Sequence, residues 1–193
     1  MKKSAALFIC IILCLSLCSC QSYEDAPEAA FSSDTVTQQM DGFSITYPED
    51  WSVLEEYDET ADYGEIVFEA GSPIREDLIC SSVIVVRGSA TEEQKLSKVV
   101  TLEDVNDIVT RLSQGLGTTL TLKESSAYTI GGRETLYFSA DFTRDDNAYT
   151  IAQTYFLHNG DVYILTVVAI EDHDAENALQ IPFTLSFAED SEL

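Results

Sequence analysis

Three turn signals divide residues 120–170 into four stretches in which apolar and polar residues alternate. The turn residues are small or polar types that accept the left-handed backbone conformation of tight hairpins. They are Gly131-Gly132, Asp145-Asp146-Asn147 and Asn159-Gly160. Because a period of two is typical of half-buried strands, the sequence predicts an antiparallel meander. Its strands are expected over residues 120–130, 134–143, 149–157 and 162–170.

The part of the chain before this meander predicts more strands and one long helix. Residues 43–47 alternate as a strand that ends at Pro48, and residues 65–70 and 78–87 are further strand candidates. The stretches 78–87 and 162–170 are apolar on both faces, which favours positions in the middle of a covered sheet. The helix is expected to begin at Thr101, with Asp104 completing a capping box, and to end near Gly115 and Gly117. Its apolar stripe consists of Leu102, Val105, Ile108, Val109, Leu112 and Leu116.

The first 19 residues have the features of a bacterial secretion signal. Lys2 and Lys3 precede a short apolar run, which is too short for a comfortable transmembrane helix of about 20 residues. Small residues then stand just before Cys20, a pattern that resembles the lipobox. Cys18 is a poorer acceptor because the bulky Leu17 precedes it. We therefore expect cleavage before Cys20, a lipid on its thiol, and a protein attached to the outer face of a bacterial membrane.

The mature chain would be strongly acidic. Loss of Lys2 and Lys3 leaves eight basic residues against 34 acidic ones, a net charge of −26. Such a chain is not expected to bind nucleic acid by neutralising phosphates, and anionic headgroups would repel it. The lipid is therefore the expected membrane attachment. After the signal, we expect a flexible acidic tether over residues 20–40, one domain over residues 41–188, and an acidic tail over residues 189–193.

Two segments resemble PsbP-like and DcrB-like domains. GFSITYPEDWSV (42–53) has a strand that ends in Tyr-Pro with a Trp soon after it, and residues 130–169 have paired strands with the Gly-Gly and Asn-Gly turns. The resemblance implies an α+β fold, an α/β/α sandwich around a central antiparallel sheet. It also implies an accessory or binding role without a shared catalytic machinery.

Few residues are candidates for a chemical site. Oxygen-rich side chains that could suit a hard cation cluster near the C-terminus, although a solvated acidic turn is the favoured explanation. They are Glu171, Asp172, His173, Asp174 and Glu176. The Asp145-Asp146-Asn147 turn has the same two interpretations. His158 is expected to be a partly exposed turn residue, Trp51 to line the core or a groove, and Cys80 to be a buried structural thiol.

No catalytic motif is present in the sequence. There is no Gly-x-Ser-x-Gly elbow, and the Gly pairs do not continue into phosphate-binding loops. We therefore expect no catalysis and no cofactor. The leading hypothesis is a lipid-anchored accessory module that acts through a protein or envelope partner. The alternative is an extracytoplasmic lipoprotein that binds a divalent cation or a small ligand.

Overall fold

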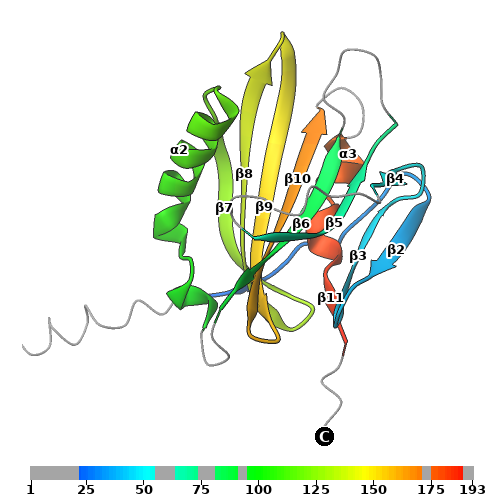
Figure 1. The fold of residues 1–193 in the computed structure, drawn as a ribbon, viewed down its shortest axis with the longest axis vertical. Helices are drawn as coiled ribbons and strands as arrows, with labels where there is room; N and C mark the ends of the chain where they lie inside the picture. Colours follow the sequence, from blue (N-terminus) through cyan, green and yellow to red (C-terminus); the bar gives the residue numbers. More distant parts are fainter. Residues whose placement is uncertain (1–21, 55–63, 74–80, 91–94, 171–174, 189–193) are drawn as a thin grey trace, which may run out of the picture.

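The computed structural model describes residues 22–54, 64–73, 81–90, 95–170 and 175–188, and these residues form two sheets and a few helices (Figure 1). The strands of the larger sheet are β1 Glu24–Asp25, β4 Ser52–Val53, β5 Glu65–Gly71, β6 Ser82–Ser89, β7 Thr121–Ile130, β8 Arg133–Arg144, β9 Asn147–His158 and β10 Asp161–Ile170. Their order is β1-β7-β8-β9-β10-β6-β5-β4. Neighbouring strands are antiparallel except for β1 and β7, which are parallel.

The predicted meander is confirmed as β7 to β10. Both residues of each tight turn have positive φ: Gly131 and Gly132 at 56° and 80°, Asp145 and Asp146 at 49° and 64°, and Asn159 and Gly160 at 50° and 81°. Turns of this kind match the right-handed twist of the strands that they join. The turn chemistry therefore sets the register of four consecutive strands.

The two strands that the sequence placed in the middle of the sheet do lie there. β10 pairs with β9 and β6, and β6 pairs with β10 and β5. The side chains of Val83, Val85 and Leu165 are fully buried on one face, whereas Ile164 and Val168 are partly buried on the other. The sheet thus has a core on each face, which we call the helix-side core and the sheet-side core.

The helix-side core lies under a single long helix. The helical elements on this face are η1 Leu96–Lys98, η2 Leu102–Asp104 and α2 Val105–Leu116. Val105, Ile108 and Val109 of α2 belong to the same buried cluster as Phe138 and Leu136 of β8. The predicted capping box is present, since the Thr101 amide and hydroxyl both donate to Asp104 Oδ2, at 2.8 and 2.7 Å. Gly117 at φ 67° ends the helix, and Gly115 lies within it.

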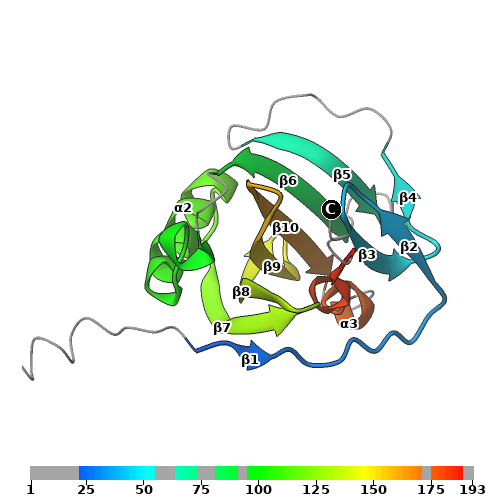
Figure 2. The ribbon, with the colours of Figure 1, turned by 90° about the horizontal axis from the view of Figure 1, so that it is seen from below.

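The sheet-side core lies under a second, smaller sheet (Figure 2). This sheet consists of β11 Ser186–Phe187, β3 Phe43–Pro48 and β2 Thr35–Gln39, in that order. Two short helices, α3 Ala175–Ala178 and η3 Ile181–Thr184, complete the cover. The α+β class with a central sheet is confirmed. The second covering layer is mostly strand rather than helix, since α3 and η3 have only four residues each.

Residues 22–40 are not the flexible tether that their composition indicated. β1 pairs with β7, β2 pairs with β3, and Ala26 and Phe31 pack against the sheet-side core. The Ser32 amide donates to Asn177 Oδ1 at 2.8 Å. Backbone pairing holds this segment, so it needs few large apolar side chains, which is why its polar composition was misleading. The proposed signal (1–19), Cys20, Cys80 and the expected tail (189–193) lie outside the described residues.

Candidate functional site

The predicted cation cluster is mostly outside the part of the chain that the structure describes. Only Glu176 is described, as an exposed residue of α3. Among the described residues, no group of three or more His, Cys, Asp or Glu side chains is placed to hold a metal ion. Glu171, Asp172, His173 and Asp174 are not described, so the cation site remains a prediction.

His158 is buried, and the expectation of a partly exposed turn residue is wrong. It is the last residue of β9, and its side chain is 3% exposed. His158 lies on the same face of β9 as Phe156, two residues earlier, and that face points into the sheet-side core. Its ring lies 5.9 Å from the ring of Phe43 and 5.8 Å from that of Phe187. The imidazole is therefore a part of an aromatic cluster rather than a surface group.

Trp51 and the Asp145-Asp146-Asn147 turn, which the sequence also singled out, have structural roles. Trp51 is 5% exposed and belongs to the sheet-side core, as expected. Asp145 and Asp146 form the exposed tip of the β8–β9 hairpin, where both have positive φ. The Asn147 side chain donates to the Asp145 carbonyl at 3.0 Å. The turn explanation accounts for this acidic tripeptide in the structure.

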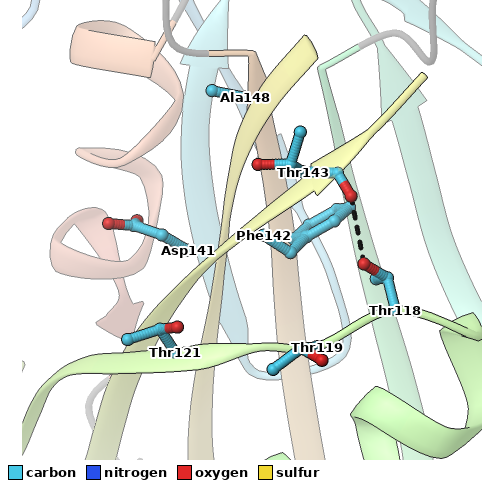
Figure 3. A pocket seen from close by; sticks show the side chains of 7 residues that line it. All are labelled: Thr118, Thr119, Thr121, Asp141, Phe142, Thr143 and Ala148. Atoms are coloured by element: carbon cyan, nitrogen blue, oxygen red, sulfur yellow. Dashed lines mark hydrogen bonds between the residues drawn. The ribbon is translucent and has the colours of Figure 1, made fainter. Parts of the chain in front are cut away.

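An open hollow of about 460 Å³ lies where the loop after α2 meets the end of the β8–β9 hairpin (Figure 3). We call it the threonine pocket, because threonines make up most of its lining. The lining residues are Thr118, Thr119, Thr121, Asp141, Phe142, Thr143 and Ala148. The Thr118 hydroxyl donates to the Thr143 carbonyl at 3.0 Å, which ties the loop to the hairpin. The backbone of β7 and β8 therefore positions the pocket.

The one carboxylate of the threonine pocket is already engaged. Asp141 Oδ1 accepts a hydrogen bond of 2.7 Å from Thr150 on the neighbouring strand, and Lys123 Nζ lies 3.3 Å from Asp141 Oδ2. Both the Lys123 and Asp141 side chains are substantially exposed, so this ion pair contributes little to stability. The hydroxyl groups and the carboxylate can hydrogen-bond a small polar molecule, and the edge of the buried Phe142 ring offers an apolar contact.

Sequence reasoning did not identify this pocket. Thr118, Thr119 and Thr121 stand at a helix–strand junction, where threonine is ordinary, and nothing local indicates a site. Thr121 lies opposite Asp141 only because of the β7–β8 register, which includes a bulge between Leu122 and Glu124. A sequence pattern does not give the position of such a bulge.

Three tyrosines have strongly perturbed acidity. Burial is the main cause that raises the pKa of Tyr137 and of Tyr155 to about 12, and burial followed by the charge of Glu134 raises that of Tyr23 to about 12. The Tyr155 hydroxyl donates to Gln153 Oε1 at 2.7 Å in the helix-side core. These phenols are therefore protonated at neutral pH, and they serve as hydrogen-bond donors or packing groups rather than as bases.

Within the described part of the chain, no helix is long and apolar enough to cross a membrane.

No protein-family model matches the sequence, and no curated protein matches it. Solved structures do resemble the fold. Cyanobacterial PsbP (CyanoP) from Synechocystis sp. PCC 6803 superposes with a TM-score of 0.61 at 14% identity, over 85% of this chain and 98% of that one. LpqN of Mycobacterium tuberculosis, described as involved in cell envelope biogenesis, gives 0.53 at 19% identity, over 80% of this chain and 90% of that one. The protein therefore has a PsbP-like fold, as the residue pattern indicated.

Proposed function

We propose that this protein is an accessory binding module, held at the outer face of a bacterial membrane by a lipid on Cys20 and acting through a protein or envelope partner. The observation that carries the proposal is the short secretion signal that ends in a lipobox-like cysteine, directly before a folded domain. The two similar folds support it, because one is a cyanobacterial PsbP and the other is described as involved in cell envelope biogenesis.

The short distance in sequence between Cys20 and the first strand limits the distance between the domain and the bilayer. β1 begins at Glu24, four residues after Cys20, and pairs with β7. Four extended residues span about 14 Å at most. A lipid on Cys20 would therefore hold the domain close to the headgroups, nearer than a tether of 20 residues would.

The charge of the domain favours attachment by the lipid alone. Glu24, Asp25 and Glu28, the acidic residues nearest to the proposed anchor, are all exposed. Anionic headgroups would repel these side chains, and the repulsion would be stronger at low salt. The acyl chains must then overcome the repulsion. Loss of the lipid would leave no attractive term for the membrane.

Fractionation of cells that express the full chain tests the anchor. Cys20→Ala should move the protein out of the membrane fraction. Cys18→Ala, a matched change two residues away inside the signal, should leave it there. Circular dichroism should show the same strand signal for the released Cys20→Ala protein as for the wild type. Membrane retention of Cys20→Ala at the wild-type level would contradict the proposal.

A second candidate function is the binding of a small polar ligand, and the threonine pocket is the observation that favours it. Its hydroxyls and the Asp141 carboxylate suit a polyhydroxylated molecule such as a sugar. N-acetylglucosamine and Ca²⁺, Mn²⁺ or Zn²⁺ salts serve as separate probes in thermal melts and calorimetry. A rise in melting temperature that Thr119→Val abolishes would support ligand binding at this pocket. Flat titrations with all four probes would remove this candidate.

A further inference from the structure

The outer strand of the small sheet, β2, has a long edge that is open to solvent. β2 pairs with β3 on one side, and no other strand in the described part of the chain pairs with it on the other. Four of its five residues are exposed. The other terminal strands of the two sheets, β1, β4 and β11, have only two residues each. Very short edge strands are a common protection against unwanted pairing, and β2 lacks this protection.

The hydrogen bonds at the two ends of β2 show which backbone groups point outward. The Glu49 amide donates to the Asp34 carbonyl at 3.0 Å, and the Met40 amide donates to the Phe43 carbonyl at 2.8 Å. In an antiparallel pair, hydrogen-bonded positions alternate with positions that bond away from the partner. With the observed register, Val36 and Gln38 bond toward β3. Thr35, Thr37 and Gln39 therefore direct their N–H and C=O groups to the open edge.

One of the outward-pointing carbonyl groups of β2 already accepts a hydrogen bond. The Gln39 carbonyl accepts a hydrogen bond of 2.8 Å from the side chain of Gln38, its own neighbour. The strand sequence, TVTQQ, contains no Lys and no Pro, and its pairing with β3 runs through five consecutive residues without a bulge. Charge, proline and bulges are the devices by which edges usually avoid another strand.

The charges around β2 select the kind of strand that could add to it. Asp34 and Asp41 stand at its two ends, and Glu49 lies beside Asp34; all three are exposed. The sequence contains no Lys or Arg from residue 4 to residue 74, so β2 and the residues that flank it in the chain carry no positive charge. A second copy of this chain would bring the same acidic ends to the interface, and like charges would oppose pairing.

We propose that the open edge of β2 binds an extended, lysine- or arginine-rich segment of a protein partner, which adds to the small sheet as a fourth strand. Main-chain hydrogen bonds to Thr35 and Thr37 supply the pairing, and Asp34, Asp41 and Glu49 select a basic segment. This inference deepens the proposed function, because it rests on the module acting through a protein partner.

Two substitutions at Thr37 separate the contribution of its backbone N–H, at the open edge, from the contribution of its side chain. Thr37→Pro removes the outward N–H and leaves the backbone hydrogen bonds between β2 and β3 in place, since the Thr37 backbone does not bond toward β3. Thr37→Val keeps that N–H and removes only the hydroxyl, which lies 3.0 Å from the Thr46 hydroxyl. Thr35→Pro, at the first residue of the strand, is the second variant if Thr37→Pro does not fold. Melting temperatures show which variants are folded.

The probe is the fluorescein-labelled peptide KTVKVTVKTK, titrated by the mature protein (residues 20–193) in detergent and followed by anisotropy. We expect saturable binding at 50 mM NaCl, protection of the residue 35–39 amides from hydrogen exchange, and at least tenfold weaker binding by Thr37→Pro. Thr37→Val should stay within twofold of the wild type, and the peptide with Glu in place of Lys should not bind. Equal binding by wild type and Thr37→Pro, or equal binding of both peptides, would overturn the proposal.

Sedimentation velocity tests the competing occupant, a second copy. Concentration-dependent dimers that Thr37→Pro abolishes would show that the edge serves self-association, which also overturns the proposal. The proposed function fails separately, through the fractionation of Cys20→Ala. If the protein is anchored to the membrane through Cys20 but its Thr37→Pro variant binds the peptide as well as the wild type, this inference fails and the proposed anchor stands.

Discussion

Gly42 and His158 approach each other so closely that any side chain at position 42 would force one of them to shift. A Cβ built on Gly42 would lie 2.1 Å from Nε2 and 2.8 Å from Cε1 of His158. Gly42 also has φ 80°, in the turn between β2 and β3. The histidine is buried among Phe43, Tyr163 and Phe187, so its ring has little room to move aside. This contact fastens the small sheet to the end of β9.

We expect Gly42→Ala to destabilise the protein by the strain of a left-handed alanine, roughly 1 kcal/mol, plus a further 1–3 kcal/mol for the clash with His158. Gly132→Ala is the matched control. Gly132 has the same φ of 80°, and its added Cβ would meet no atom within 4 Å. Urea unfolding should therefore show only the backbone cost at position 132. Equal losses of unfolding free energy in the two variants would mean that His158 gives way freely.

The buried tyrosines predict a loss of stability at alkaline pH. A tyrosine in the unfolded chain ionises near pH 10, whereas Tyr155 in the folded protein ionises at about 12. Because the folded pKa is the higher one, the stabilising effect is complete below pH 10 and is lost as the pH rises toward 12. Tyr155→Phe should reduce the fall in unfolding free energy over this range. The absorbance at 295 nm of the protein unfolded in urea, where all nine tyrosines titrate near pH 10, gives the reference titration for the unfolded state. If the unfolding free energy of Tyr155→Phe fell with pH as steeply as that of the wild type, Tyr155 would not be the cause of the alkaline loss of stability.

The capping box of α2 gives a prediction at acidic pH. Hydrogen bonds from the Thr101 hydroxyl and amide lower the pKa of Asp104. Its contribution is therefore present above the pKa of the unfolded carboxyl and is lost as the pH falls through the folded pKa. Asp104→Ala should cost about 1 kcal/mol at pH 7 and nothing after protonation. Asp107→Asn removes a charge from the same first turn without breaking the box, and it should cost only a few tenths. Chemical denaturation at pH 7 and at pH 2.5 measures both.

The elements that the sequence predicted well are those with strong local signals. Each turn from Gly131 to Gly160 contains residue types that tolerate positive φ, and alternation between the turns indicates which face is buried. The Thr101–Asp104 box and Gly117 marked the ends of the helix region for the same reason, since capping depends on residues a few positions apart. Local chemistry was sufficient for these parts of the fold.

The features that the sequence did not predict depend on pairing between distant segments. The sequence of β2 is typical of a polar linker because β2 is an exposed edge strand, which contacts β3 mainly through its backbone and needs no apolar side chains. His158 follows the inward face of β9, yet its polar side chain and its position before Asn159-Gly160 indicated the surface. The threonine pocket needs the register of β7 and β8, which no short motif specifies. Residue types alone do not determine contacts of this kind.

Mass spectrometry of the N-terminal peptide, taken from protein purified out of the membrane fraction, tests the central claim most directly. A lipid anchor requires that the chain start at Cys20 and that this residue carry the mass of a diacylglyceryl group. The peptide from the Cys18→Ala protein should have the same mass. An unmodified Cys20 thiol, or a chain that still carries residues 1–19, would contradict the proposed anchor and the membrane location that depends on it.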